Sequence, residues 1–441
     1  MLSEEFLTSI CGPPIAANTA ISKDVGLYSH SLNPTWAVKA TFKKSSAPPH
    51  CVAASDTHIF AAQDQKAHVH VYSRLRGNQE ALIAFPERIC SLALASNVLV
   101  LGTSEGRLIL WETCTGRQVT TPPCHVQAVT CLAVTPYHVL SGSDDSNIHV
   151  WSLASLLEFG VDTAQEADLT LSNHRGAITD LAVGPSTNPE TGICVSASAD
   201  KTCVLWNYHS GQILRTLLFP SVPLCLALDP SARALFASAE DGGLYFVEFF
   251  GNKPLLGSAS AELASIVVQV HAPLSVADAD YGPASCLAVS YDGTAVLSGH
   301  TKGKILRWNL LDKSHPTELG NLNASVTNIV PIPVLPLSGK PYSTVNVVKP
   351  NKSQRQYTIT CQLEGAMGGE SRFSRDLNST GFPVDRLENA VSMFVSSLKT
   401  QSDEKADSDL VKENEELKAI IAGQKELHET TMRCQEASNT S

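Results

Sequence analysis

A unit of about 40 residues recurs along this chain, and a repeat of that length constrains the fold more than any other feature. In each copy a short run of small residues and a tight turn lead into an apolar run. The apolar runs end on Tyr72, Trp111, Trp151, Trp206, Val247 and Trp308. In several copies a segment of the Leu-Ala-Val type, such as VTCLAV at 129–134, comes before the small residues. Two intervals are longer than the others, because they carry insertions at 154–170 and 251–283.

Each unit has the sequence character of four short β-strands. Apolar residues alternate with polar ones over short runs, and turn residues separate the runs. A four-stranded unit of about 40 residues is typical of one blade of a β-propeller. Six such units end between Tyr72 and Trp308, and a ring with an open edge would be a liability. We therefore expect an all-β, seven-bladed β-propeller over residues 1–335, closed by strands from 14–44 pairing with a returning strand at 326–334.

Two of the units resemble the WD-repeat family most closely, through the stretches GSDDSNIHVW and SASADKTCVLWN. In that family a His, a strand Ser or Thr, a turn Asp and the Trp form a buried hydrogen-bonded chain. The resemblance assigns these roles, in that order, to His125, Ser141, Asp145 and Trp151 in one blade and to His174, Ser196, Asp200 and Trp206 in the next. Trp111 and Trp308 take the Trp position in two further blades. A His–Asp pair can also serve acid–base chemistry, but a fully satisfied buried network mainly specifies a fold, and we favour that role.

Motifs that carry chemistry are otherwise scarce in the sequence. It has no Gly-rich phosphate loop, no G-x-S-x-G, no H-E-x-x-H and no cysteine cluster with metal-ligand spacing. His68 and His70 lie on one face of a predicted strand and could contribute to a metal site, yet no carboxylate or cysteine follows at ligand spacing. We expect no enzyme, no cofactor and no metal. An active site at the central channel, as in some propellers, is the remaining enzymatic alternative.

Charge and cysteine usage narrow the class of protein further. A formal charge of −11 argues against nucleic-acid binding through the overall field, although direct RNA contact stays open. The 12 cysteines include no Cys-x-x-Cys pair, so we expect reduced thiols, with a disulfide framework as the rival interpretation. The N-terminal stretch lacks the basic region of a signal peptide, and no apolar run is long enough to span a bilayer. We expect a soluble, intracellular protein without membrane contact.

The pattern changes after residue 335. Residues 336–382 are rich in Gly and Ser and net positive, which predicts a linker or a partner-docking segment. Residues 383–437 predict a helical, coiled-coil tail with two apolar stripes. The first stripe is Leu387, Val391, Phe394 and Leu398, and the second is Leu410, Asn414, Leu417 and Ile421. We expect the second stripe to pair two copies of the chain as a homodimer; packing on the propeller or on a helix of another subunit are the alternatives.

Over nearly its whole length the chain is similar to the WD-repeat subunit of the rixosome, the family of WD repeat-containing protein 18 and its fungal pre-rRNA-processing counterparts. The similarity is most specific in HRGAITDLAVG, SASADKTCVLWNYHSGQILRTLLF and SAEDGGLYFVEFF. It implies a scaffold in a nuclear complex, present in nucleolus and nucleoplasm, with a large helical-repeat scaffold subunit and a third subunit. That complex acts on pre-60S ribosomal particles, where internal transcribed spacer 2 is removed; a chromatin-associated role in replication licensing is a secondary implication.

A generic WD-repeat adaptor is the alternative, either a ubiquitin-ligase substrate receptor or a trafficking scaffold. Residues 336–441 contain no recognisable ligase-binding module. We expect the two insertions to carry the subunit-specific contacts, because loops hold the variable function of a propeller.

Overall fold

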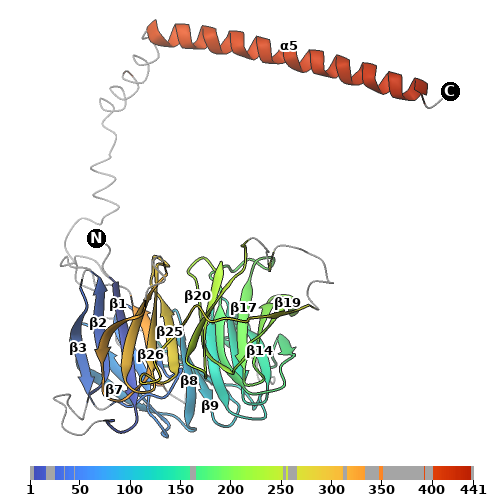
Figure 1. The fold of residues 1–441 in the computed structure, drawn as a ribbon. Helices are drawn as coiled ribbons and strands as arrows, with labels where there is room; N and C mark the ends of the chain where they lie inside the picture. The colour runs from blue at the N-terminus through green and yellow to red at the C-terminus, as the bar shows by residue number, and fades with distance from the viewer. Residues whose placement is uncertain are drawn as a thin grey trace. The chain divides into compact units, whose positions relative to one another are not determined.

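The computed structural model describes residues 4–15, 25–33, 35–43, 45–158, 165–251, 255–256, 266–310, 315–332, 347–350, 392 and 401–438. The chain divides into two compact units, Met1–Cys361 and Gln362–Ser441. The first unit is a ring of seven sheets, antiparallel except for one added strand (Figure 1). The prediction of a seven-bladed propeller is therefore confirmed.

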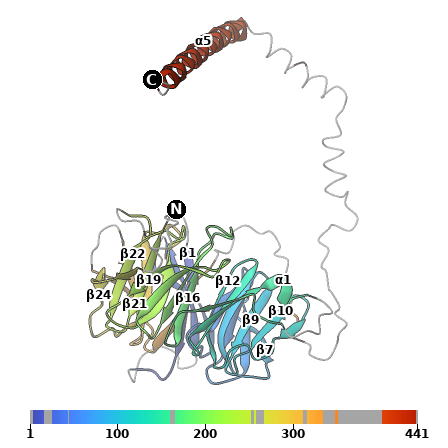
Figure 2. The ribbon, with the colours of Figure 1, turned by 90° about the vertical axis from the view of Figure 1, so that its right-hand side faces the viewer.

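Six blades follow one another along the chain, and in each the strands run in sequence order from the centre of the ring outward. The first three of these blades contain β4 (Val52–Ala54), β5 (His58–Ala62), β6 (His68–Ser73) and β7 (Gln79–Ala84); β8 (Ile89–Ala95), β9 (Val98–Thr103), β10 (Leu108–Glu112) and β11 (Gln118–Thr120); and β12 (Val129–Val134), β13 (His138–Ser143), β14 (Asn147–Ser152) and β15 (Leu169–Ser172). Figure 2 shows the ring from a second direction, with β7, β9, β10 and β12 among the labelled strands.

The other three blades include the longer insertion, at 251–283, which follows the strand Gly243–Glu248. They contain β16 (Ile178–Val183), β17 (Ile193–Ser198), β18 (Thr202–Asn207) and β19 (Gln212–Leu218); β20 (Pro223–Leu228), β21 (Ala234–Ala239), β22 (Gly243–Glu248) and β24 (Ser275–Val276); and β25 (Ala284–Val289), β26 (Ala295–His300), β27 (Lys304–Asn309) and β28 (Thr317–Asn321). The insertion also supplies β23 (Val267–Gln269), which pairs in parallel with β19 as a fifth strand. The shorter insertion forms the one-turn helix α1 (Leu153–Leu156) and leads into β15.

The seventh blade joins the two ends of the propeller. Its sheet has the order β29-β1-β2-β3, with β29 (Ser325–Ile332) on the inside and β1 (Glu4–Cys11), β2 (Val25–Asn33) and β3 (Ala37–Lys43) outside it. The innermost strands contact one another around the ring, from β4 through β8, β12, β16, β20 and β25 to β29, which contacts β4. The expectation that the N-terminal strands lie within 14–44 was wrong for β1. This strand begins in an acidic stretch without turn signals, and it is the one that meets β29.

A buried polar cluster fastens this closure. The side chain of Asn328 in β29 donates to Ser9 Oγ at 2.7 Å and to the carbonyl oxygen of Pro48 at 2.8 Å. Thr327 Oγ1 lies 2.8 Å from Ser9 Oγ and donates to the carbonyl oxygen of Ala47 at 2.7 Å. Residues from β1, from β29 and from the loop before β4 therefore share one network. Because every member must find its partner, this network specifies how the two ends of the propeller pair, in addition to the apolar contacts between them.

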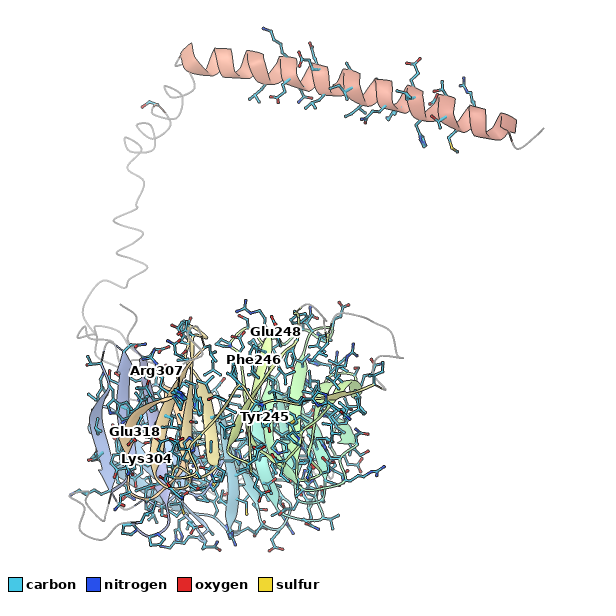
Figure 3. All side chains as sticks on the ribbon, in the orientation of Figure 1. Tyr245, Phe246, Glu248, Lys304, Arg307 and Glu318 are labelled. Carbon is cyan, nitrogen blue, oxygen red and sulfur yellow. The ribbon has the colours of Figure 1, made fainter. Side chains whose placement is uncertain are left out.

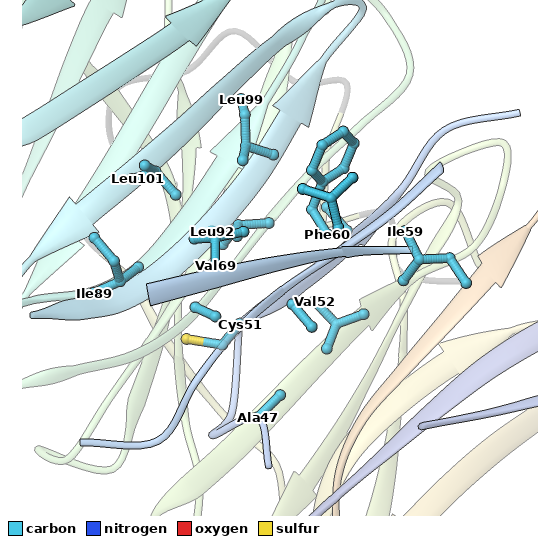
Figure 4. Close-up of a cluster of buried hydrophobic side chains, with 14 of the residues drawn as sticks. Ala47, Cys51, Val52, Ile59, Phe60, Val69, Ile89, Leu92, Leu99 and Leu101 are labelled. Carbon is cyan, nitrogen blue, oxygen red and sulfur yellow. The ribbon is translucent and has the colours of Figure 1, made fainter. Parts of the chain in front are cut away.

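The hydrophobic core lies between neighbouring blades, as in any ring of stacked sheets. Figure 4 shows the cluster between the β4–β7 and β8–β11 blades, where Ile59, Val69, Leu99 and Leu101 are fully buried. Along some strands buried and exposed side chains alternate, and along others the side chains are buried on both faces of the sheet. Burial on both faces occurs because each sheet packs against two neighbouring blades. The tight turns leading into the third strands are left-handed at Ser146 and Lys201, with φ of 68° and 69°.

The second unit contains α5 (Gln401–Ser438). The helix agrees with the predicted tail over the residues described. Leu410, Leu417 and Ile421 are each more than half exposed in the single chain. The first predicted stripe, from Leu387 to Leu398, lies outside the described residues, as do 336–346 and 351–382.

Candidate functional site: hydrogen-bond networks in the blades

The β12–β15 blade brings together the four residues that the WD-repeat resemblance selected. His125 Nδ1 lies 3.0 Å from Asp145 Oδ2, and His125 Nε2 lies 2.9 Å from Ser141 Oγ. Trp151 donates its indole N–H to the same Ser141 oxygen at 3.1 Å. The contacts define one direction of donation, because the carboxylate can only accept. Trp donates to Ser, Ser donates to His, and His donates to Asp.

The imidazole of this network is neutral at neutral pH. Burial, helped by the adjacent His149, lowers the pKa of His125 to about 4 although Asp145 acts in the other direction. Burial raises the pKa of Asp145, but hydrogen bonds from the Asn147 amide, from His125 and from the Val126 amide outweigh it and leave that pKa below its usual value. The Asp145 side chain also caps the turn, since its Oδ1 accepts the Asn147 amide at 2.9 Å.

The β16–β19 blade repeats the arrangement. His174 Nε2 lies 2.7 Å from Ser196 Oγ, and Trp206 donates to the same oxygen at 2.9 Å. His174 Nδ1 lies 3.3 Å from Asp200 Oδ2 and 3.1 Å from Thr202 Oγ1. Burial lowers the pKa of His174, and Asp200 opposes this shift.

Trp308 and Trp111 depart from this pattern in different ways. Trp308 donates to Ser298 Oγ at 2.7 Å, but the imidazole on that oxygen belongs to His300, two residues along the same strand, at 2.9 Å. His300 was missed from the sequence, although the Gly-His pair at the end of VLSGH was visible. Trp111 is fully buried and donates to a main-chain oxygen, that of Val348, at 3.0 Å.

Two blades without a Trp in this position have networks of their own. In the β20–β22 blade Tyr245 donates its hydroxyl hydrogen to Asp241 at 2.6 Å, and burial together with that carboxylate raises the pKa of Tyr245 to about 12. Figure 3 shows Tyr245 and its neighbours Phe246 and Glu248 along β22. In the closing blade His30 Nε2 lies 2.8 Å from Thr8 Oγ1, and burial lowers the pKa of His30 to about 3.

The Ser–His–Asp geometry has the connectivity of a hydrolytic triad, but the surroundings prevent that chemistry. Ser141 and Ser196 are both 0% exposed, and each oxygen already accepts an indole hydrogen. A nucleophile must reach a substrate carbon, and these hydroxyls are enclosed by their blades. The networks can hold turns and strands in register, and they cannot attack a bound molecule.

Residues that could ligate metals are scattered in the part of the chain that the structure covers. His70 Nδ1 lies 3.0 Å from the hydroxyl of Tyr72, and no group of three or more His, Cys, Asp or Glu side chains is placed to hold a metal among the described residues. Ten cysteines are described in the structure, and each is free. Burial raises the pKa of Cys286 to about 12. Within the described ranges no helix is both long and apolar enough to cross a membrane.

The ring and its Ser–His–Asp–Trp networks define a WD-repeat β-propeller, and the comparisons agree. The profile of the WD domain, G-beta repeat family matches residues 116–152 and 166–207. Pre-rRNA-processing protein IPI3 of Yarrowia lipolytica is 30% identical over 293 residues, which cover 65% of this chain and 67% of that protein. The chain therefore belongs to the family of pre-rRNA-processing protein IPI3 and WD repeat-containing protein 18.

Other relatives extend the comparison across kingdoms. WD repeat-containing protein 18 of Danio rerio is 28% identical, and the match covers 63% of each chain. Protein ROOT INITIATION DEFECTIVE 3 of Arabidopsis thaliana is also 28% identical, with 70% of each chain covered. Among solved structures, the computationally designed Ika8 protein has a TM-score of 0.51 at 20% identity, over 73% of this chain and 90% of that one. This last likeness concerns the fold alone.

Proposed function

We propose that this protein is a non-enzymatic scaffold subunit of a nuclear complex that processes pre-rRNA. The observation that carries the proposal is the match to pre-rRNA-processing protein IPI3 over 65% of this chain. We further propose that the complex acts where internal transcribed spacer 2 is removed, during maturation of the large ribosomal subunit. The location would be the nucleolus and nucleoplasm.

The geometry of the blades supports a scaffold in preference to an enzyme. In both Ser–His–Asp chains the Ser and the His are buried and the Asp is half-buried, and every member is hydrogen-bonded, so their role in this proposal is to fix blade structure. Partner contacts would then fall on exposed loops, including the insertion that supplies β23 and β24. We propose as partners a large helical-repeat scaffold subunit, a third subunit and pre-60S particles.

Affinity purification followed by sedimentation tests this function. Tagged protein should co-sediment with large-subunit precursors, and its depletion should cause precursors that retain internal transcribed spacer 2 to accumulate. A generic adaptor would instead purify with ligase or coat components and leave precursor rRNA unchanged, which would overturn the proposal.

We also propose that α5 pairs two copies of the chain. Leu410, Leu417 and Ile421 recur at coiled-coil spacing with Asn414 between them, a polar residue of the kind that fixes register in two-stranded coils. An isolated helix with an apolar stripe is marginal by itself and needs a partner surface. The more than half exposed stripe supports this pairing.

Light scattering tests the pairing. The full chain should have the mass of a dimer, whereas Leu417→Asp and a truncated chain ending near residue 382 should be monomeric. Ala419→Asp is the matched control, because it adds the same charge on the opposite face of the helix, and it should remain dimeric. A full chain that is monomeric across micromolar concentrations would exclude the homodimer and leave α5 as a docking helix for another subunit.

A further inference from the structure

The hydrogen bond of Trp111 is unusual within this ring. Trp151, Trp206 and Trp308 each donate to a serine on the neighbouring strand of their own blade. Strand pairing places Leu101 at the corresponding position of the β8–β11 blade, so this blade offers no hydroxyl to Trp111. A buried N–H without an acceptor is costly, and the acceptor here comes from a segment more than 200 residues away in the sequence, the carbonyl oxygen of Val348 at 3.0 Å.

Residues 347–350, Val-Val-Lys-Pro, are held at this blade by main-chain atoms. Val348 accepts the Trp111 indole hydrogen through its carbonyl oxygen and donates its own amide to the carbonyl oxygen of Thr113 at 2.8 Å. These two bonds fix one residue from both sides, as a strand is fixed when it is added to a sheet edge.

The turn between β10 and β11 is shaped to admit this segment. Gly116 has φ +75°, and a Cβ built there would lie 2.7 Å from the carbonyl oxygen of Lys349 and 2.8 Å from Val348 Cγ1. Any side chain at position 116 would therefore collide with residues 348–349. Gly211, in the corresponding turn of the β16–β19 blade, has nearly the same φ of +72° but nothing closer than 3.7 Å. The close approach is specific to the β8–β11 blade.

A cavity beside Val347 continues the same surface. Val347 packs against the buried cluster of the two blades and lines a cavity of about 430 Å³. Other lining residues are Thr57, His58, Phe60, Leu94, Asn97 and Thr113. Its lining combines apolar side chains, such as those of Phe60 and Leu94, with polar ones, such as that of Asn97, a mixture typical of ligand sites.

We propose that Trp111, Thr113, Gly116 and this cavity form a peptide-binding site, the Trp111 groove, whose occupant is the chain's own segment 347–350. The main-chain bonds require an extended backbone, and Val347 anchors the segment by packing against the buried cluster of these blades. Val-Val favours the extended conformation that the groove requires. Covalent connection raises the effective concentration of the segment at the groove, so the chain fills its own site. This inference is independent of the proposed function.

A labelled peptide tests the groove in the full-length protein. Val348→Pro removes the amide hydrogen that the Thr113 carbonyl oxygen accepts, and position 348 lies outside the blades, so the variant vacates the groove without changing a residue of the ring. A fluorescent peptide of residues 344–352 should bind Val348→Pro at least tenfold more tightly than wild type, whose groove is filled. Adding Gly116→Ala to Val348→Pro should weaken peptide binding at least tenfold, whereas adding Gly211→Ala should not change it. Equal binding to wild type and Val348→Pro, or equal losses from the two glycine substitutions, would overturn the proposal.

Hydrogen exchange gives a second measurement without added peptide. The Val348 amide should exchange at least tenfold more slowly in wild type and in Gly211→Ala than in Gly116→Ala. An unprotected Val348 amide in wild type would also overturn the proposal.

Discussion

Replacement of Trp206 by alanine is the sharpest test of how a blade is stabilised. The indole is 2% exposed and packs in one cluster with Leu181, Val204 and Tyr208, and its N–H donates to Ser196. Removing a buried Trp costs about 3–5 kcal/mol through lost burial and the cavity left behind. For a propeller of about 330 residues, the per-residue entropy of unfolding converts this cost into a fall in Tm of roughly 4–7 °C.

Thermal and urea denaturation followed by circular dichroism measure this effect. Trp206→Phe is the informative companion, because it retains most of the apolar volume and loses only the hydrogen bond, at a cost of about 1–2 kcal/mol. Asp200→Ala should cost about 1–3 kcal/mol, because the Arg175 and Thr202 amides, which donate to the carboxylate at 2.8 and 2.9 Å, lose their acceptor. If Trp206→Ala melted within a degree or two of wild type, the buried Trp206 indole would not stabilise its blade as argued.

Three further perturbations address the rest of the ring. Asp180→Ala leaves the buried Leu226 amide, now 2.7 Å from the carboxylate, without an acceptor and should lower the free energy of unfolding by about 1–3 kcal/mol in urea titrations; an unchanged midpoint would contradict this. Asn328→Ala should destabilise the closure by a similar amount and raise amide exchange in β1 more than in β17; uniform exchange would argue against a local role. Because the unfolded His titrates near 6.5 and His125 near 4, the unfolded chain takes up the proton first as pH falls through this range, so stability should decline there. The decline should be shallower in His125→Gln, and parallel curves for the two proteins would refute the assignment.

The parts predictable from the sequence are those in which a local pattern repeats. Tight turns need an Asp cap and small neighbouring residues, and the Trp ends an apolar strand. The stretch GSDDSNIHVW therefore predicts both the position of its blade and the residues of the hydrogen-bond network. His300 escaped detection because its imidazole comes from the strand itself and not from the preceding loop. β1 escaped because its partner β29 lies at the other end of the propeller, and no local signal encodes a pairing of that separation. The contact of Val348 with Trp111 is also non-local. Its one hint in the sequence is Leu101, which stands where three other blades have a serine.

The closing blade also has a consequence for synthesis. Its three outer strands leave the ribosome first, while β29, the innermost strand of the same sheet, emerges only after the other six blades. Until then β1 presents an unpaired edge, the kind of surface that chaperones shield and that otherwise aggregates. A product that stops before Ile332 cannot seal its ring, however well its other blades have folded. The ring can therefore close only after translation has passed this point. Truncated chains keep the unpaired edge and remain exposed to proteolysis.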